Sequence, residues 1–439
     1  MNDIKEQRTI RKLFNFGRLI KNLTMNTYRQ KTDPKKSTLI GKTSGRRAVY
    51  TPDNAKHVFV CGTTGSGKTV ALSNYIKSAI EKNYPLLVVD GKGDTGTGSM
   101  LDIIQKLNDG KRKIHVINLT HPDRSDKYNP FKNATPTMVK DMLINMTNWS
   151  EEHYKLNTER YLQRLVTLMH TANIPLSFKT IIKYMPIKKF TELSAKLLKA
   201  EIIDKHAHME NTEIATTSGK ISESAVARFS TIAESELGCI FTDDGIDIFD
   251  ALKENAIILF ILNPLIYPEL SQVMGRLVLI DSKKAINKLF ETQNRKFFIM
   301  DEINTYASTV LIDLINKSRS ANVTCIVATQ SLSDLDFACG EAFKEQVIEN
   351  CNNYIVLRQN SSVNAEHWAK ILGTMQSMEM TYQMREEAFR TTVTGYGSAR
   401  QTRKFYYHPD EIKELTTGKG IFMSRDIGHH AKVKITKPF

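Results

Sequence analysis

The sequence has no long apolar run and few cysteines. Its longest apolar stretch, residues 256–262, is far shorter than the roughly eighteen residues of a membrane span, and its N-terminus is too polar for a secretory signal peptide. The cysteines form an odd, scattered set without metal-ligand spacing: Cys61, Cys239, Cys325, Cys339 and Cys351. We expect buried, reduced thiols in a cytoplasmic protein.

Positive charge is plentiful but unevenly placed. The 439 residues carry a formal net charge of +14, and +10 of it lies in residues 1–50, which hold thirteen Lys and Arg against three acidic residues. This excess favours a polyanionic partner and says nothing about the fold. Beyond residue 50, short basic runs at 111–113, 188–189 and 283–284 and the segment 380–404 are candidate DNA contacts, with solvated surface, or a mobile loop at 380–404, as the alternative.

The first 48 residues stand apart from the rest. Residues 4–23 combine Arg and Lys with apolar residues at helical spacing, which predicts a basic amphipathic helix. Such a helix lies on an anionic membrane or packs on its own protein. Residues 24–48 are polar and predict a linker or a short hairpin.

The strongest local signal is a phosphate-binding loop. Residues 62–69 fit the pattern G-x-x-x-x-G-K-[ST], between a short β-branched and aromatic run and a helical stretch at 70–82. Lys68 is expected to bridge the outer phosphates of a nucleotide and Thr69 to bind Mg²⁺. The alternative is a chance glycine-rich turn. The predicted nucleotide-binding residues are Gly62, Thr63, Thr64, Gly65, Ser66, Gly67, Lys68 and Thr69.

The chain around this loop alternates strands and helices. Continuous apolar strands spaced by helices predict an α/β fold with a parallel sheet covered on both faces. Residues 133–240 lack strand signals and predict helices at 136–148, 151–172, 178–185, 190–203 and 219–238. We therefore expect a basic N-terminal segment and linker (1–48), a nucleotide-binding domain (49–132 and 241–439) and an inserted all-α domain (133–240).

A second signal, a pair of acidic residues, completes the predicted nucleotide site. The apolar run 297–300 ends in Asp301 and Glu302. Asp301 is expected to hold the Mg²⁺ shell through water, and Glu302 to orient and deprotonate the attacking water. Many strands end in acidic turns, so the pattern gains its meaning from the upstream loop.

Two more polar residues flank the next strand, 322–328. Gln330 follows it and can touch both the attacking water and the γ-phosphate, although a capping or turn glutamine would look the same. Arg319 precedes it and is the best candidate for the cation that stabilises charge in the transition state, often supplied by a neighbouring molecule. The alternative is a solvated surface arginine.

With these pieces in order, the chain resembles the HerA/FtsK superfamily of ring-forming ATPases, and within it the TraG/TraD-type coupling proteins of conjugative type IV secretion. The likeness covers most of residues 50–430. It extends beyond the Walker A loop, which is Gly62–Thr69, and the end of the Walker B strand, which is Asp301 with Glu302. Its further motifs are Asp90–Asp94, Tyr128–Phe131, Ile246–Leu252, Met274–Asp281, Arg319–Asn322 with Ala328–Ser331, Phe405–Ile412 and Gly418–Ile421.

The resemblance implies a RecA-like P-loop motor domain with an inserted all-α domain, assembly as a homo-hexamer, and ATP- and Mg²⁺-dependent movement of DNA through a central pore. By this analogy Arg319 matches the family's trans-acting arginine and Gln330 its sensor. The implied partners are DNA, relaxase and relaxosome proteins, and a membrane or channel subunit of a type IV secretion system.

The chain departs from typical coupling proteins because it shows no transmembrane helix. A separate membrane protein then recruits it, or residues 4–23 rest on the cytoplasmic face of the membrane, or it is a member with another role. Such roles are a HerA-like helicase in DNA repair, a secretion ATPase that handles protein, or a nucleotide-gated docking module with incidental turnover. Only a short tail follows Ile421, which disfavours FtsK-type segregation with a winged-helix domain.

Overall fold

The computed structural model describes residues 33–439 except residues 55, 222, 291–293 and 388–389, and between residues 378 and 399 it describes only the backbone. The predicted basic helix at residues 4–23 lies outside this part of the chain. No helix among the described residues is long and apolar enough to cross a membrane.

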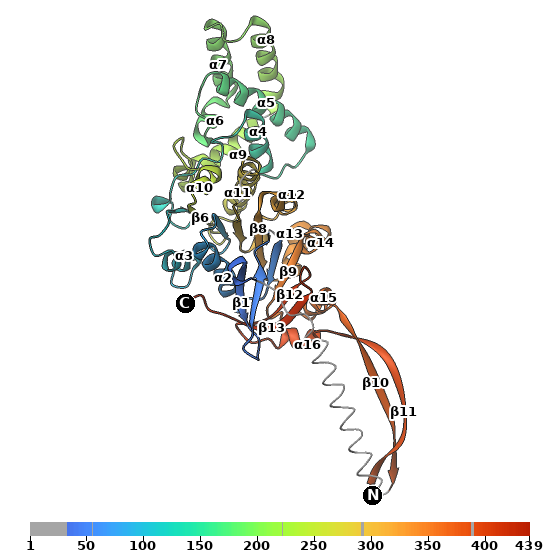
Figure 1. The fold of residues 1–439 in the computed structure, drawn as a ribbon. Helices are drawn as coiled ribbons and strands as arrows, with labels where there is room; N and C mark the ends of the chain where they lie inside the picture. Colours follow the sequence, from blue (N-terminus) through green and yellow to red (C-terminus); the bar gives the residue numbers. More distant parts are fainter. Residues whose placement is uncertain (1–32, 55, 222, 291–293, 388–389) are drawn as a thin grey trace.

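A central sheet of eleven strands organises the chain (Figure 1). Strands β9, β3, β8, β7, β4, β6 and β5 are parallel neighbours, and β12, β13, β1 and β2 extend the β9 edge in antiparallel order. The predicted α/β class with a parallel-rich sheet is confirmed. In spatial order the strands are β2 (Ala48–Pro52), β1 (Ser37–Lys42), β13 (His429–Ile435), β12 (Lys419–Ser424), β9 (Cys351–Val356), β3 (His57–Cys61), β8 (Val323–Thr329), β7 (Lys296–Met300), β4 (Leu86–Asp90), β6 (Ile257–Ile261) and β5 (Ile114–Asn118).

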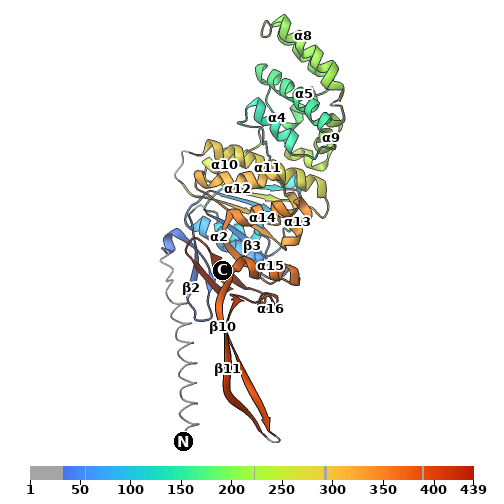
Figure 2. The same ribbon diagram turned by 90° about the vertical axis from the view of Figure 1, so that its right-hand side faces the viewer.

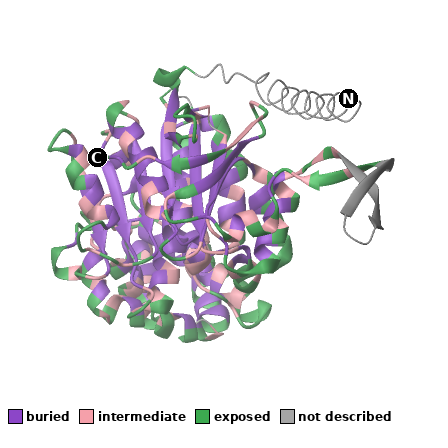
Figure 3. Ribbon diagram, turned by 90° about the horizontal axis from the view of Figure 1, so that it is seen from below, coloured by how far each residue is buried: buried purple, intermediate pink, exposed green. Residues whose placement is uncertain are grey.

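Helices cover both faces of this sheet, which explains the unbroken apolar strands. In β3, Val58 and Val60 pack in one buried cluster, and Phe59 and Cys61 in another on the opposite face. The strands are buried and the outer helix faces exposed (Figure 3). The first cluster includes α2 (Lys68–Glu81) and α3 (Met100–Asn108). The second includes α10 (Ile248–Lys253), α11 (Pro268–Lys288), α12 (Thr309–Ser318), α13 (Leu332–Cys339), α14 (Glu341–Asn350), α15 (Ser362–Leu372) and α16 (Pro409–Lys413).

Residues 133–240 form helices and no strand in their described part, and they extend away from the sheet (Figures 1 and 2). The helices are α4 (Pro136–Asn145), α5 (Glu152–Thr171), α6 (Phe178–Tyr184), α7 (Ile187–Lys199), α8 (Lys205–Ile214) and α9 (Glu223–Glu234). The sequence did not predict α8, because it buries only Asn211 and Ile214 and so carries almost no apolar periodicity. The division into domains at these boundaries remains a prediction.

A buried ionic network fixes the segment that leads into these helices. The Nζ of Lys284 lies 2.9 Å from Asp247 and 2.8 Å from Asp281, and it also donates to the backbone carbonyls of residues 130 and 132. The hydroxyl of Tyr128 donates to Asp281 at 2.9 Å. Lys284 is 4% exposed, so the interpretation of residues 283–284 as a DNA contact was wrong for this lysine.

Two segments for which the sequence left alternatives open form hairpins. Of the DNA-contact and mobile-loop alternatives for residues 380–404, the loop was wrong for the described residues, because β10 (Thr374–Glu387) and β11 (Arg390–Phe405) pair as an antiparallel hairpin that projects from the body of the molecule (Figures 1 and 2). Of the linker and hairpin alternatives for residues 24–48, the described part, from residue 33 on, has a hairpin: β1 pairs with β2 and also with β13.

The cysteine prediction was correct for only part of the set. Cys61, Cys325 and Cys351 are buried in strands as free thiols, and burial raises the pKa of Cys61 to about 12. Cys239 and Cys339 are exposed, because they lie in a short 3-10 helix and at the end of α13 rather than in the sheet.

Candidate active site

The phosphate-binding loop connects β3 to α2, as the sequence predicts. Gly67 precedes the helix with φ of 110°, a conformation that a residue with a Cβ rarely adopts. The hydroxyl of Ser66 donates to the carbonyl of Thr63 at 2.6 Å, which tightens the turn. The loop therefore ends with backbone N–H groups at the start of a fourteen-residue helix, the arrangement that binds phosphate.

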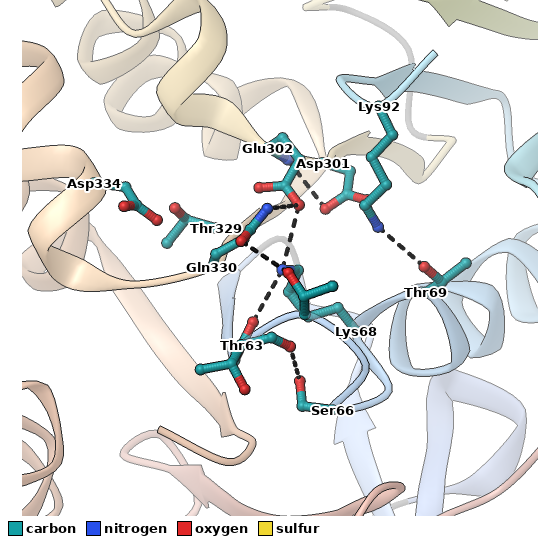
Figure 4. Close-up of polar contacts among 12 residues, drawn as sticks. Thr63, Ser66, Lys68, Thr69, Lys92, Asp301, Glu302, Thr329, Gln330 and Asp334 are labelled. Atoms are coloured by element: carbon teal, nitrogen blue, oxygen red, sulfur yellow. Dashed lines mark hydrogen bonds and ion pairs between the residues drawn. The ribbon is translucent and has the colours of Figure 1, made fainter. Parts of the chain in front are cut away.

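Lys68 joins this loop to the acidic end of β7. Its Nζ donates to the carbonyl of Gly62 at 2.9 Å and lies 3.3 Å from Oε1 of Glu302 (Figure 4). Strand β8 separates β3 from β7, so the loop and the acidic pair face each other across one strand. The structure thus brings together two segments more than two hundred residues apart in the chain, as we expected.

Asp301 and Glu302 follow β7 in a tightly held turn. Asp301 is fully buried, and its Oδ1 accepts a hydrogen bond from the backbone N–H of Glu302 at 3.0 Å. Glu302 has φ of 49°, a left-handed conformation that costs about 1 kcal/mol and is typical of functional sites. Burial, together with the charge of Asp301, raises the pKa of Glu302. A carboxylate with a raised pKa suits a general base.

Gln330 links the loop and the acidic pair from the end of β8. Its Nε2 donates to Oε1 of Glu302 at 3.2 Å, and its Oε1 accepts from the hydroxyl of Thr64 at 3.0 Å (Figure 4). Ser331, rather than Gln330, caps α13 by a reciprocal pair of hydrogen bonds with Asp334. The glutamine is therefore free to contact the nucleotide site rather than to cap the helix.

Sequence reasoning missed Lys92 as a member of this cluster. Its Nζ lies 2.9 Å from Oδ2 of Asp301 and donates to Oγ1 of Thr69 at 3.1 Å (Figure 4). Burial disfavours its charge, but Asp301 and the other carboxylates outweigh burial and raise the pKa of Lys92. The available signal was its place two residues after Asp90, at the carboxyl end of buried strand β4.

Asp90 adds a third carboxyl group to the same edge. Its Oδ1 accepts the backbone N–H of Lys92 at 3.0 Å. Burial and the charge of Asp301 raise its pKa to about 7. This edge of the sheet therefore concentrates negative charge that lysine side chains balance.

The chain near its C-terminus also holds the loop. The hydroxyl of Thr417 donates to the carbonyl of Gly65 at 3.0 Å, and the N–H of Gly418 donates to the carbonyl of Ser66 at 2.9 Å. The sequence offered only the family resemblance at Gly418–Ile421 as a signal for this contact. Strand β12 thus begins at the phosphate-binding loop.

Arg319 lies apart from these residues. It precedes β8, whereas Gln330 follows it, so the seven-residue strand places the two roughly 20 Å apart. Burial chiefly lowers the pKa of His57 to about 4, and the charge of Arg319 contributes, which places the arginine near the amino end of β3. Arg319 is exposed and makes no side-chain hydrogen bond or ion pair with any described residue. The structure does not bring Arg319 to the nucleotide site of its own chain.

The residues present fit Mg²⁺ bound together with a nucleotide. Thr69 and Asp301 offer oxygen atoms to one cation, since both contact the ammonium group of Lys92. The buried Oε2 of Glu302 accepts no hydrogen bond from the described residues, which leaves it available to a water. No group of three or more His, Cys, Asp or Glu in the described part of the chain is arranged to hold a metal by itself. Phosphate oxygens would complete the shell.

Two family models match the parts of the chain that make this site. The model described as TraM recognition site of TraD and TraG matches residues 295–417, which include Asp301, Glu302, Arg319 and Gln330. The FtsK/SpoIIIE family matches residues 19–99, which include the phosphate-binding loop. Two uncharacterized proteins of Mycoplasma pneumoniae are each 32% identical to the chain, over 104 and 93 residues. These alignments cover 24% and 18% of this chain and 69% and 78% of those relatives.

Solved structures share the fold over nearly the whole chain. The unbound monoclinic form of the bacterial conjugative coupling protein TrwBdeltaN70 has a TM-score of 0.66 and 16% identity, over 94% of this chain and 90% of that chain. TrwB in complex with ADP and Mg²⁺ has a TM-score of 0.61 and 16% identity, over 93% and 95%. VirB4 of Thermoanaerobacter pseudethanolicus has a TM-score of 0.58 and 12% identity, over 92% and 97%. The RecA-like P-loop fold expected from the resemblance is thereby confirmed.

The family models cover both halves of the site, and the fold brings those halves together. One half of the site thus matches the FtsK/SpoIIIE family and the other half the TraM recognition site of TraD and TraG, within a RecA-like P-loop fold.

Proposed function

We propose that this protein is an ATP-driven DNA translocase that couples a DNA–relaxase complex to a type IV secretion channel in conjugation. The observation that carries the proposal is the contact between Lys68 and Glu302, which joins a phosphate-binding loop to an acidic strand end in one buried site. The similarity to conjugative coupling proteins over most of the chain supports the same role.

The proposal gives each residue of the site a step, supported by its contacts. The ammonium of Lys68 pairs with Glu302 at 3.3 Å. When ATP binds, this ammonium exchanges Glu302 for the outer phosphates as its partner. Glu302 is then released to accept a proton from the attacking water on a carboxylate oxygen. Gln330, which already contacts Glu302 and Thr64, holds that water in line and senses the γ-phosphate.

Thr69 and Asp301 would hold Mg²⁺, Thr69 directly and Asp301 through water. When bound, the metal would supply positive charge that offsets the negative charge developing during phosphoryl transfer. The backbone N–H groups at the start of α2 add their partial charges to the same phosphates.

Arg319 of a neighbouring copy supplies the cation that stabilises charge in the transition state. The exposure of Arg319 and its lack of a partner among the described residues support a role outside its own chain. A homo-hexameric ring places the amino edge of one subunit beside the nucleotide of the next and encloses a pore for DNA. In that ring Arg319 stabilises transition-state charge in trans.

The partners of this activity are DNA, relaxase and relaxosome proteins, and a membrane or channel subunit of the secretion system. The match of residues 295–417 to the TraM recognition site of TraD and TraG supports a relaxosome contact. The protein acts at the cytoplasmic face of the membrane in this proposal.

The test is DNA-dependent ATP hydrolysis by the purified full chain, together with displacement of a third DNA strand from a triplex. We expect DNA to stimulate hydrolysis and the protein to displace the third strand only with ATP. Hydrolysis that is unaffected by DNA, without displacement, would contradict translocation. Lys68→Ala controls for activity from a contaminating ATPase.

A further inference from the structure

A lysine occupies the cation position between the two predicted metal-binding side chains. The ammonium of Lys92 lies 2.9 Å from Asp301 and 3.1 Å from the hydroxyl of Thr69 (Figure 4). These are the side chains that the proposed function assigns to Mg²⁺. An ammonium and a divalent cation repel each other strongly at such distances, so both cannot use this position together.

The backbone around Lys92 is fixed. Its N–H donates to Asp90 at 3.0 Å. The preceding Gly91 packs so closely that an added Cβ would lie 2.7 Å from the Cβ of Glu302 and 2.9 Å from the carbonyl oxygen of Asp301. The backbone of Lys92 therefore lies beside the acidic pair, in a turn that packs directly against Asp301 and Glu302.

The side chain, in contrast, is free to leave. About 35% of the Lys92 side chain is exposed, whereas the side chain of Asp301 is fully buried. Rotation about the side-chain bonds of Lys92 is enough to carry its ammonium towards solvent while the turn stays in place. Asp301 has no such freedom.

We propose that Lys92 is a resident counter-cation of the nucleotide site. Its ammonium neutralises buried Asp301 until a nucleotide arrives with its metal, and its displacement sets the Mg²⁺ concentration at which the nucleotide is retained. This inference rests on the proposed function, because it concerns the same nucleotide site.

The experiment measures binding of a fluorescent ADP analogue to the full chain while Mg²⁺ is titrated into metal-free buffer. Lys92→Met removes the competing charge, so the half-saturating Mg²⁺ concentration should fall about tenfold. Lys92→Arg keeps the charge and pairs more firmly with a carboxylate, so this concentration should rise several-fold. Lys106→Met is the matched control, because Lys106 pairs with Asp102 on the surface of α3, and it should change nothing.

Metal-free binding of the same analogue separates this role from phosphate binding. We expect the metal-free affinity of Lys92→Met to lie at most a few-fold below that of the wild type, because Asp301 has lost its counter-charge, and we expect saturating Mg²⁺ to remove this difference. A loss of affinity that persists at saturating Mg²⁺ would make Lys92 a phosphate ligand and overturn the proposal. An unchanged or higher Mg²⁺ requirement in Lys92→Met, or an unchanged or lower one in Lys92→Arg, would overturn it as well. If Lys92→Met does not fold, the Lys92→Arg result decides.

A nucleotide-free measurement keeps the test independent of the proposed function. Without nucleotide, Mg²⁺ should raise the Tm of Lys92→Met more than that of the wild type or Lys106→Met, because only the first has lost the counter-charge of Asp301. Equal Tm responses in all three proteins would contradict a counter-cation role. Failure of the wild type to bind ADP would instead contradict the proposed ATPase site and leave this Tm comparison to decide the role of Lys92.

Discussion

The two edges of the central sheet differ in how their charged residues are satisfied. At the carboxyl edge, Lys68, Lys92 and Gln330 pair with the buried carboxyl groups of Asp301 and Glu302. At the amino edge, Arg319 is exposed and has no side-chain partner among the described residues. The first edge is complete within one chain apart from the nucleotide, and the second presents a cation to whatever lies beside it.

This difference separates residues that we expect to act within the chain from Arg319, which we propose acts between chains. Burial at the carboxyl edge strengthens each electrostatic contact with phosphate and excludes bulk water. An exposed arginine gains similar strength only when a neighbouring subunit covers it. The comparison therefore predicts different behaviour when the two edges are mutated and when variants are mixed.

The largest effect is expected at the carboxyl edge, in Lys68→Ala. Loss of the ammonium leaves the outer phosphates without their cation, so nucleotide affinity should fall roughly a hundredfold or more and hydrolysis should disappear. Equilibrium binding of a fluorescent ATP analogue measures this change. Lys77→Ala, on the same helix but with its side chain 40% exposed, is the control and should bind normally. Normal nucleotide binding by Lys68→Ala would contradict the assignment of this loop to the nucleotide site.

The next largest effect is expected at the amino edge, in Arg319→Ala. Hydrolysis should fall by about a hundredfold or more while nucleotide binding by the single chain stays intact, because Arg319 lies far from its own nucleotide. Lys317→Ala removes another exposed cation two residues away and should have little effect.

Mixing variants tests whether Arg319 acts between chains. Subunits with Arg319→Ala keep an intact carboxyl edge, and subunits with Lys68→Ala keep an intact arginine. Mixtures should therefore regain part of the wild-type turnover that neither variant shows alone. Absence of recovery at every mixing ratio would count against a role of Arg319 in a neighbouring subunit. The two edges would then not differ in acting within one chain or between chains.

The sequence predicted the residues of the carboxyl edge because they end strands of one sheet. Gly62–Thr69, Asp301 and Gln330 each follow an apolar run, and parallel strands present such residues at one edge. Arg319 was predicted from its place before a strand, but a single sequence does not show which surfaces meet another subunit. Its role therefore remains a prediction.

Other features lacked a local signal. Lys92 contacts Asp301 only because β4 and β7 are neighbours in the sheet, and this pairing depends on the whole topology. The sequence did not predict the hairpin of β10 and β11, because its polar and charged residues obscure the alternation of a strand. Helix α8 buries too few residues to show a period.

A smaller effect is expected within the carboxyl edge, in Gln330→Ala. The variant should bind ATP normally, because Lys68 and the loop backbone remain, and hydrolyse it about tenfold more slowly, because the attacking water loses one orienting group. The kcat and KM from steady-state assays separate the two effects. A change in KM alone would assign Gln330 to ground-state binding.

The smallest effect is expected from pH. Burial and Asp301 raise the pKa of Glu302 above its ordinary value of 4.5, and only the ionised carboxylate accepts a proton. The kcat should therefore decline as the pH is lowered, with the midpoint above that of an ordinary glutamate. Tm measurements over the same range exclude unfolding. A flat profile would contradict the assignment of Glu302 as the base.

The most direct test of this nucleotide site is Glu302→Gln in the full chain, assayed with radiolabelled ATP under single-turnover conditions. We expect ATP binding close to that of the wild type and a hydrolysis rate lower by about 10²–10⁴-fold, because the amide cannot accept the proton of the attacking water. Hydrolysis at the wild-type rate would contradict the claim that residues 62–69 and the acidic end of β7 act on the same nucleotide.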